Sequence, residues 1–377
     1  MVYLDYNATT PLCPGAKEAM LPFIEGSFGN PSSIHAEGRR ARAAVDDARD
    51  RLAAVFAVKP HEIIFTGGGT ESCNLGVIGI ARAHAPRGKH LVTSPIEHHA
   101  VLQAFEYLKH FEGFEVDILP VDPAGTVDPE TLADAIRPDT TLVSVMHANN
   151  ETGAIQPVRE LADVCRRHGT VFHADAVQSF GKLPLRPHED GIPAVSIAAH
   201  KFYGPKGVGA LILSAGVAIS RTSHGGAHEN TRRPGTENVA GIAGMAAAAE
   251  EAVFRDNSKL LPLREMLWGG IADVCPGAIR NGNPELCLAN TLNVSFPGAD
   301  GESLLMGLDL EGICVSSGSA CMVGSIQPSH VLVAMGIAAP VAQASVRFSL
   351  GCETTPDDIR QTIRALGRVL ELQPLAA

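Results

Sequence analysis

Several features that would place this chain in other classes of protein are absent from its sequence. None of the eight cysteines forms a CxxC pair, and no cysteine–histidine cluster has zinc-finger spacing. Cysteines spread over so long a chain do not suggest a disulfide framework, so we expect a reducing compartment. No apolar run reaches the roughly 18 residues that span a bilayer. The start, "MVYLDYNATTPLCP", lacks the basic and apolar regions of a signal peptide. We therefore expect a soluble, cytoplasmic protein with no membrane partner.

An excess of positive charge is also absent. The chain has 30 lysines and arginines against 41 acidic residues, a net charge of −11, which argues against nucleic acid as a partner. A hydrophobic content of 45% is sufficient for a large core. At 377 residues, and with about 150 residues per domain, two domains are expected.

The first two thirds of the chain alternate between helical and strand-like patterns. Between about residues 36 and 256, short and nearly all-apolar strands are expected at 62–66, 90–94, 115–120, 141–147, 170–175, 194–199 and 207–214. Helical segments lie between most of them. This alternation predicts an α/β fold with a mostly parallel, seven-stranded sheet between helices.

The pattern changes after residue 257. A helical stretch (258–275) leads to strands at 291–296, 313–317 and 344–351 and to a final helix opening at Thr355. These elements predict a smaller α+β domain. We expect a large domain over 14–257 and a small domain formed by 1–13 and 258–377.

Polar residues follow the predicted strands, where ligands bind in open α/β sheets. Gly67 to Ser72, "GGGTES", suits an anion at a helix N-terminus, although it could be only a tight turn and is not a Walker motif. Asp175 ends another strand, with Gln178 three residues on, and alone could be a helix cap. Lys201 follows a third strand in "HKFYGPKG" and alone could lie on a surface loop. Together, an anion site, a carboxylate and a lysine are what pyridoxal phosphate requires.

A cysteine in "SSGSACMVGS" (316–325) raises a separate question. Cys321 lies among glycine, serine and alanine, where a thiol could be inert, redox-active or catalytic.

With these motifs, the chain closely resembles the cysteine desulfurases, which are class V aminotransferase-like enzymes of the nitrogen-fixation and iron–sulfur-assembly type. The resemblance covers essentially the whole chain in order. It is carried by "YLDYNATTP" (3–11), "GNPSSIHAEGRRAR" (29–42), "FTGGGTES" (65–72), "EHHAVL" (97–102), "ANNETG" (148–153), "HADAVQS" (173–179), "HKFYGPKG" (200–207), "RRPGTEN" (232–238), "SSGSAC" (316–321) and "VRFSLG" (346–351).

The resemblance implies a pyridoxal-phosphate-dependent transferase of fold type I and a role for each matched residue. Lys201 carries the cofactor as a Schiff base, Asp175 faces the pyridine nitrogen and Gln178 the ring hydroxyl. His98 stacks on the ring and helps with proton transfer. The adjacent His99 competes for that role but is expected to be structural.

The same resemblance divides the remaining residues between phosphate and substrate. Gly69, Thr70 and His200 line the phosphate, together with Thr236 from the other subunit of a homodimer. Ala198 stands where such enzymes usually have a serine ligand, so backbone donors there must suffice. Asn150 contacts the cofactor and, together with Arg347, holds the substrate carboxylate. The alternative for Arg347 is a structural ion pair.

The implied reaction is conversion of L-cysteine to L-alanine with a persulfide left on Cys321. An iron–sulfur scaffold or another acceptor protein takes the sulfur, so Cys321 meets metal only transiently, through its persulfide and a partner-held cluster. Cys73 and Cys314 are expected to be buried small hydrophobes. The alternatives are a selenocysteine lyase, an aminotransferase, which has no use for the thiol, and a scaffold without cofactor, against which Lys201 and Asp175 argue.

Overall fold

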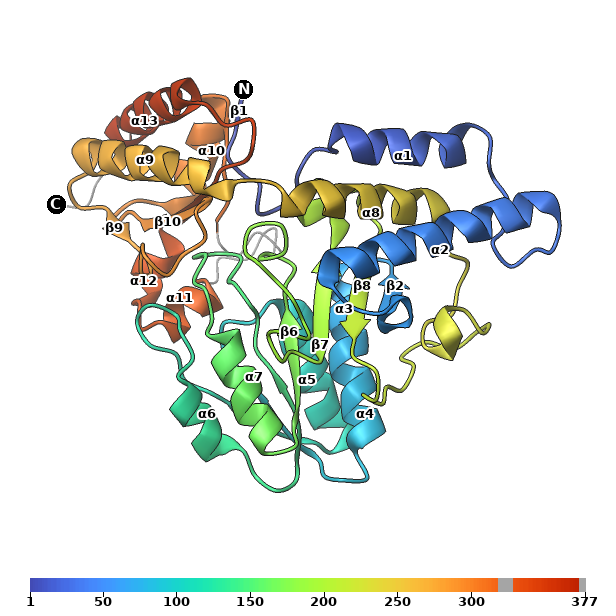
Figure 1. Cartoon of the computed structure of the whole chain (residues 1–377). Coiled ribbons are helices and arrows are strands. Elements are labelled where there is room, and N and C mark those ends of the chain that lie inside the picture. The colour runs from blue at the N-terminus through green and yellow to red at the C-terminus, as the bar shows by residue number, and fades with distance from the viewer. Residues whose placement is uncertain (318–327, 373–377) are drawn as a thin grey trace.

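The computed structural model describes residues 1–317 and 328–372, and its central element is a seven-stranded sheet (Figure 1). The strand order is β2-β8-β7-β6-β5-β3-β4. The strands are β2 (Ile63–Thr66), β3 (His90–Thr93), β4 (Glu115–Ile118), β5 (Thr140–Ser144), β6 (Val171–Asp175), β7 (Ala194–Ala198) and β8 (Gly209–Leu213). All pairs are parallel except those of β8, which runs antiparallel to β7 and β2. The predicted mostly parallel α/β sheet is confirmed.

Helices cover both faces of this sheet, because alternate strand residues point to opposite sides. One face packs Phe65, Val143 and Phe172 against helices, and the other packs Ile64 and Leu142. The first set of helices is α1 (Pro14–Glu25), α2 (Ala36–Phe56), α6 (Pro129–Ala135), α7 (Val158–Arg167) and α8 (Val239–Val253). The second set is α3 (Gly69–Asn74), α4 (Ile80–His84) and α5 (His99–Glu112).

Between α3 and α4 the helix makes one π turn (Leu75–Gly79), and there it approaches the sheet closely. A Cβ atom at Gly76 would lie 2.8 Å from Cδ2 and Nε2 of His173 on β6. The His173 ring is fully buried, with Nδ1 2.8 Å from Ser144 Oγ and Nε2 2.9 Å from Ser196 Oγ. Because this ring is held at both nitrogens, only glycine fits opposite it.

The rest of the chain forms a second core around a three-stranded sheet. Strand β10 (Thr291–Ser295) lies antiparallel between β9 (Ile279–Arg280) and β12 (Ser345–Ser349). The buried side chains include Leu4, Leu292 and Phe348. The helices here are α9 (Leu261–Val274), α10 (Gly301–Leu310), α11 (His330–Ala334), α12 (Ala339–Gln343) and α13 (Pro356–Glu371). Strand β1 (Val2–Tyr3) pairs in parallel with β11 (Ile313–Cys314), so the N-terminus lies beside these C-terminal elements (Figure 1).

Most expected element boundaries agree with the structure. Thr355 caps α13 in a capping box with Asp358, whose carboxylate accepts from the Thr355 backbone N–H. Strand β11 has two residues rather than the expected five, and a 3₁₀ turn (Asn257–Leu260) precedes α9. Among the described helices, none is both long and apolar enough to cross a membrane.

Candidate active site

A cavity of about 390 Å³ lies at the carboxyl ends of strands β5, β6 and β7 and the start of α3. Its lining brings together ten of the predicted site residues: Gly69, Thr70, His98, Asn150, Asp175, Gln178, Ala198, His200, Lys201 and Arg347. Because parallel strands end at one edge of the sheet, turns far apart in sequence meet there.

Lys201 ends a 3₁₀ turn (Ala199–Lys201) that directly follows β7. Its side chain is partly buried, and Nζ donates hydrogen bonds to the backbone oxygens of Asn7 at 2.6 Å and Ala8 at 2.9 Å. The amine therefore lies inside the cavity wall, and the surface-loop alternative is wrong.

Asp175 is the last residue of β6 and is only 5% exposed. Its Oδ1 accepts a hydrogen bond from Val177 N at 2.9 Å, in a turn rather than at the start of a helix. The helix-cap alternative is therefore wrong as well. One turn further on, Gln178 Nε2 donates to the backbone oxygen of Asn7 at 2.8 Å.

His98 caps α5, with Nδ1 accepting a hydrogen bond from Ala100 N at 3.0 Å. Burial lowers the pKa of His98, and nearby Lys201 lowers it further against the opposing effect of Asp175. The ring is therefore neutral near pH 7, and with Nδ1 as acceptor its proton lies on Nε2. His99 does not line the cavity and packs against His330, with ring centroids 4.8 Å apart.

Arg347 lies in the middle of β12, opposite Asn293 of β10. Its Nη2 donates to Asp5 Oδ1 at 2.7 Å and its Nη1 to the backbone oxygen of Asn150 at 2.9 Å. The buried Nε has no hydrogen-bond partner among the described residues. Arg347 thus makes the structural ion pair considered above and is also one of the residues that line the cavity.

At the anion end, the turn before α3 packs closely against the strand ends. A Cβ atom at Gly69 would lie 3.0 Å from Val177 Cγ2 and 3.2 Å from Ala198 Cβ. Nearby, His200 Nδ1 lies 3.2 Å from Thr9 Oγ1, and burial lowers the pKa of His200 to about 4, helped by Lys201 and Lys206. Gly69 has no side chain, so the backbone can approach an anion closely here. The neutral His200 imidazole can donate a hydrogen bond to the same anion.

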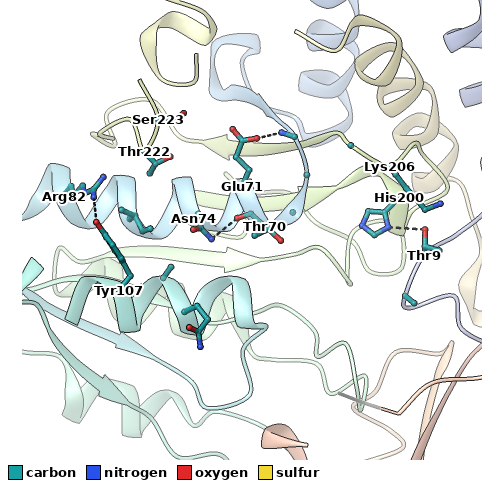
Figure 2. A pocket seen from close by; sticks show the side chains of 18 residues that line it. Thr9, Thr70, Glu71, Asn74, Arg82, Tyr107, His200, Lys206, Thr222 and Ser223 are labelled. Carbon is teal, nitrogen blue, oxygen red and sulfur yellow. Dashed lines mark hydrogen bonds between the residues drawn. The ribbon is translucent and has the colours of Figure 1, made fainter. Parts of the chain in front are cut away.

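Beside this end lies a wider opening of about 1060 Å³ (Figure 2). Thr70 and His200 line both hollows, and Glu71, Lys206 and Tyr107 line only the wider one. Two predicted residues are not placed in either hollow. Thr236 is exposed on the segment before α8, and Cys321 lies outside the described residues.

The described residues that flank 318–327 are fixed near the cavity. Ser316 pairs with Arg347, whose backbone N–H donates to the Ser316 oxygen at 2.7 Å. On the other side, Ser329 Oγ donates to Glu151 Oε2 at 2.5 Å, and burial raises the pKa of Glu151. The described residues on either side of 318–327 therefore lie beside Arg347 and Glu151.

Sequence reasoning assigned no role to Asn7, which the structure makes a central site residue. Its backbone oxygen accepts from both Lys201 and Gln178. Its Nδ2 donates to Thr291 Oγ1 at 2.9 Å, and its Oδ1 accepts from Asn290 Nδ2 at 3.0 Å. The only signal in the sequence was its place in "YLDYNATTP", because no local pattern links residue 7 to residue 290.

The fold and the cavity together define a class of protein. A lysine, a buried carboxylate and a glycine turn converge in a cavity of the size that holds a small cofactor, and these groups fit pyridoxal phosphate. The chain is a pyridoxal-phosphate-dependent enzyme of fold type I. It belongs to the aminotransferase class-V family, whose model matches residues 2–362.

Relatives within this family are similar over almost the entire chain. A cysteine desulfurase IscS from Dictyoglomus turgidum is 48% identical over 373 residues, which is 98% of this chain and 94% of that protein. A solved NifS-like protein has a TM-score of 0.92 at 38% identity, over 98% of this chain and 99% of that one. A structure of SspA in complex with cysteine has a TM-score of 0.82 at 35% identity, over 93% and 99%.

Proposed function

We propose that this chain is a cysteine desulfurase that converts L-cysteine to L-alanine and leaves the sulfur as a persulfide on Cys321. The sulfur then serves iron–sulfur cluster assembly or another acceptor protein. The observation that carries the proposal is that Lys201, Asp175 and Arg347 line one cavity. An amine, a carboxylate and a carboxylate-binding guanidinium are the groups that an amino acid substrate and this cofactor need.

The residues of the cavity divide between cofactor and substrate. Lys201, Asp175 and Gln178 would hold the ring with His98, while the phosphate would lie by Gly69, Thr70, His200 and the backbone at Ala198. When bound, the cofactor supplies an acceptor for the electron pair that remains after the substrate loses its α-proton. Arg347 and Asn150 would hold the substrate carboxylate, since both line the cavity and a guanidinium group pairs well with a carboxylate.

Proton transfer falls to two groups that the structure places in the cavity. Lys201 would take the α-proton of the substrate with its side-chain amine. Neutral His98, with its proton on Nε2, is placed to exchange a proton with the substrate side chain.

Sulfur transfer then needs a nucleophile. The Cys321 thiolate attacks the sulfur of the bound cysteine, so an S–S bond forms while the Cβ–S bond breaks. The electron pair of that broken bond stays on Cβ, which takes a proton and becomes the methyl group of alanine. Cys321 must be reduced to begin this step, and the seven described cysteines are all free, so we place the reaction in the cytoplasm.

We further propose that the active unit is a homodimer in which Thr236 of one subunit reaches the phosphate of the other. Two observations support this: Thr236 is exposed in its own chain, and the wide opening beside Thr70 is free to receive another segment. Thr236→Ala should weaken cofactor retention, and sedimentation should give a dimer. A fully active monomer at assay concentration would contradict the proposal.

Product release from L-cysteine tests the proposed reaction. Without a thiol reductant, alanine should appear in an amount close to one per subunit and then stop, because Cys321 stays persulfidated. With reductant, alanine and sulfide should accumulate in equal amounts over many turnovers. Turnover of selenocysteine but not of cysteine would instead favour the lyase alternative.

A further inference from the structure

Lys182 is a partly buried cation to which the reaction described above gives no role. It lies four residues after Gln178, in the turns that follow β6, and lines a small void together with Lys201 and Asn290. Burial lowers the pKa of Lys182 to about 7, and the nearby charges of Lys201 and Arg347 contribute. Removing an ammonium group from water is costly, so hydrogen bonds to neighbouring residues must compensate for its lost hydration. These partners therefore indicate which part of the site the group supports.

The Lys182 ammonium group makes hydrogen bonds to two residues of the site. Nζ donates to Gln178 Oε1 at 2.9 Å and to Asn7 Oδ1 at 3.2 Å. When protonated, this group donates hydrogen bonds and cannot accept them, which favours the observed orientation with the Gln178 oxygen toward Lys182. Its amide nitrogen then faces the opposite way, where one N–H reaches the Asn7 backbone oxygen at 2.8 Å. The second N–H of this amide remains for the cavity that Gln178 lines.

Without such a partner, the orientation of a side-chain amide is weakly determined. The oxygen and nitrogen are nearly the same size, so a half-turn costs little unless the neighbours differ in hydrogen-bonding character. Here the neighbours differ strongly, with a cation on one side and a carbonyl oxygen on the other. The same carbonyl oxygen accepts from Lys201 Nζ at 2.6 Å, which fixes its position.

We propose that Lys182 is a positioning residue that orients the Gln178 amide, so that a nitrogen donor rather than an oxygen faces the ring hydroxyl of the cofactor. The proposal rests on the role given to Gln178 in the proposed function. It adds that the orientation of Gln178 depends on a second lysine, which does not line the main cavity.

The test uses the holoenzyme without substrate and follows the pH at which the visible absorbance of the bound cofactor changes. Lys182→Met keeps the length of the side chain but removes the donor. Without this donor, the ring oxygen carries more negative charge and holds the proton on the neighbouring Lys201 nitrogen more strongly. The pH midpoint of the absorbance change should therefore rise by about one pH unit. Lys259→Met, at an exposed lysine, is the matched control and should leave the midpoint unchanged.

A double-mutant cycle separates orientation of Gln178 from a general effect on the fold. Gln178→Ala alone should raise the midpoint, and adding Lys182→Met to it should produce no further rise. Equal shifts from Lys182→Met in both backgrounds, or no shift in either, would overturn the proposal. Lys182→Gln retains an N–H donor and should recover part of the shift, which also provides a measurement if the methionine variant does not fold.

This readout is independent of the reaction catalysed. If the enzyme fails to release alanine from L-cysteine, the proposed function is wrong, but the midpoint shifts can still be measured. If alanine is released and the shifts are absent, only the role of Lys182 is wrong.

Discussion

The two ends of the cavity are built in different ways. The cofactor end (His98, Asp175, Gln178 and Lys201) comes from turns after strands of one continuous sheet. The substrate end (Asp5, Asn150 and Arg347) joins the N-terminal segment, the turn after β5 and strand β12 of a different sheet. The large sheet brings the backbone of the first together, whereas the second exists only when three separate parts of the chain are packed together.

Asn7 connects the two ends. Its backbone oxygen holds Lys201 and Gln178, while its side chain donates to the backbone oxygen of Asn150 at 3.2 Å and to Thr291. The two ends of the cavity are therefore connected through one asparagine. Changes at the cofactor end should therefore alter the reaction rate and the absorbance spectrum of the bound cofactor. Changes at the substrate end should alter substrate binding and sulfur transfer.

The largest effect is expected from Lys201→Ala at the cofactor end. Removing the amine takes away both the covalent attachment and the base for the α-proton, so turnover should fall by more than about 10³-fold. The measurement is alanine release, together with borohydride reduction of the bound cofactor. Lys259→Ala serves as control. A reducible lysine adduct elsewhere in the Lys201→Ala protein would show that the attachment site is wrong.

Cys321→Ser should separate the two ends most clearly. A serine hydroxyl stays protonated at neutral pH, so sulfide release should fall by about 10²-fold or more, while the cofactor spectrum and its response to cysteine remain. Mass spectrometry should locate one added sulfur on the peptide that contains Cys321. The controls are Cys314→Ala and Cys352→Ala, which should retain activity. Persulfide on either of them would assign the transfer to a different cysteine.

Arg347→Lys should weaken only the substrate end. A lysine retains the charge near Asp5 but cannot present the planar pair of donors, so KM for L-cysteine should rise about 10- to 100-fold. Cofactor affinity, measured by equilibrium dialysis, should be unchanged. Arg360→Lys, in an exposed pair with Asp357, is the control. An equal loss of cofactor affinity would mean that the two ends are not separable.

The smallest effect is expected for the free energy of unfolding, and it comes from the buried His173 on β6. Burial lowers the pKa of His173 to about 3, whereas the unfolded chain has a value near 6.5. Between those values the unfolded state binds the extra proton, so His173 makes stability fall by about 1.4 kcal/mol per pH unit as the pH drops. His173→Asn should lower stability at pH 7 yet reduce this slope in urea titrations. His110→Asn, at an exposed position, should leave both unchanged.

The sequence predicted the cofactor end far better than the substrate end. Asp175, Gln178 and Lys201 follow apolar strands, and parallel strands place their ends together whatever the loops between them do. Asp5 and Asn7 had no such signal, because their partners at 347 and 290 are set by packing between elements. Lys182 had none either, because no regular helix or strand pattern in the turns after β6 indicates that its amine meets Gln178. The antiparallel direction of β8 was also invisible, since an apolar strand looks alike in either direction.

The contact of Gly76 with the His173 ring has a consequence for the coenzyme phosphate. The helix that begins at Gly69 can approach β6 only as far as that ring allows, so the imidazole acts as a spacer of fixed thickness. The distance from β6, which carries Asp175, to the turn proposed to face the phosphate is therefore set by His173, a residue of that strand that does not line the cavity. A methyl group added at residue 76 would alter the span between the two anchoring points of the coenzyme without changing any atom that contacts it.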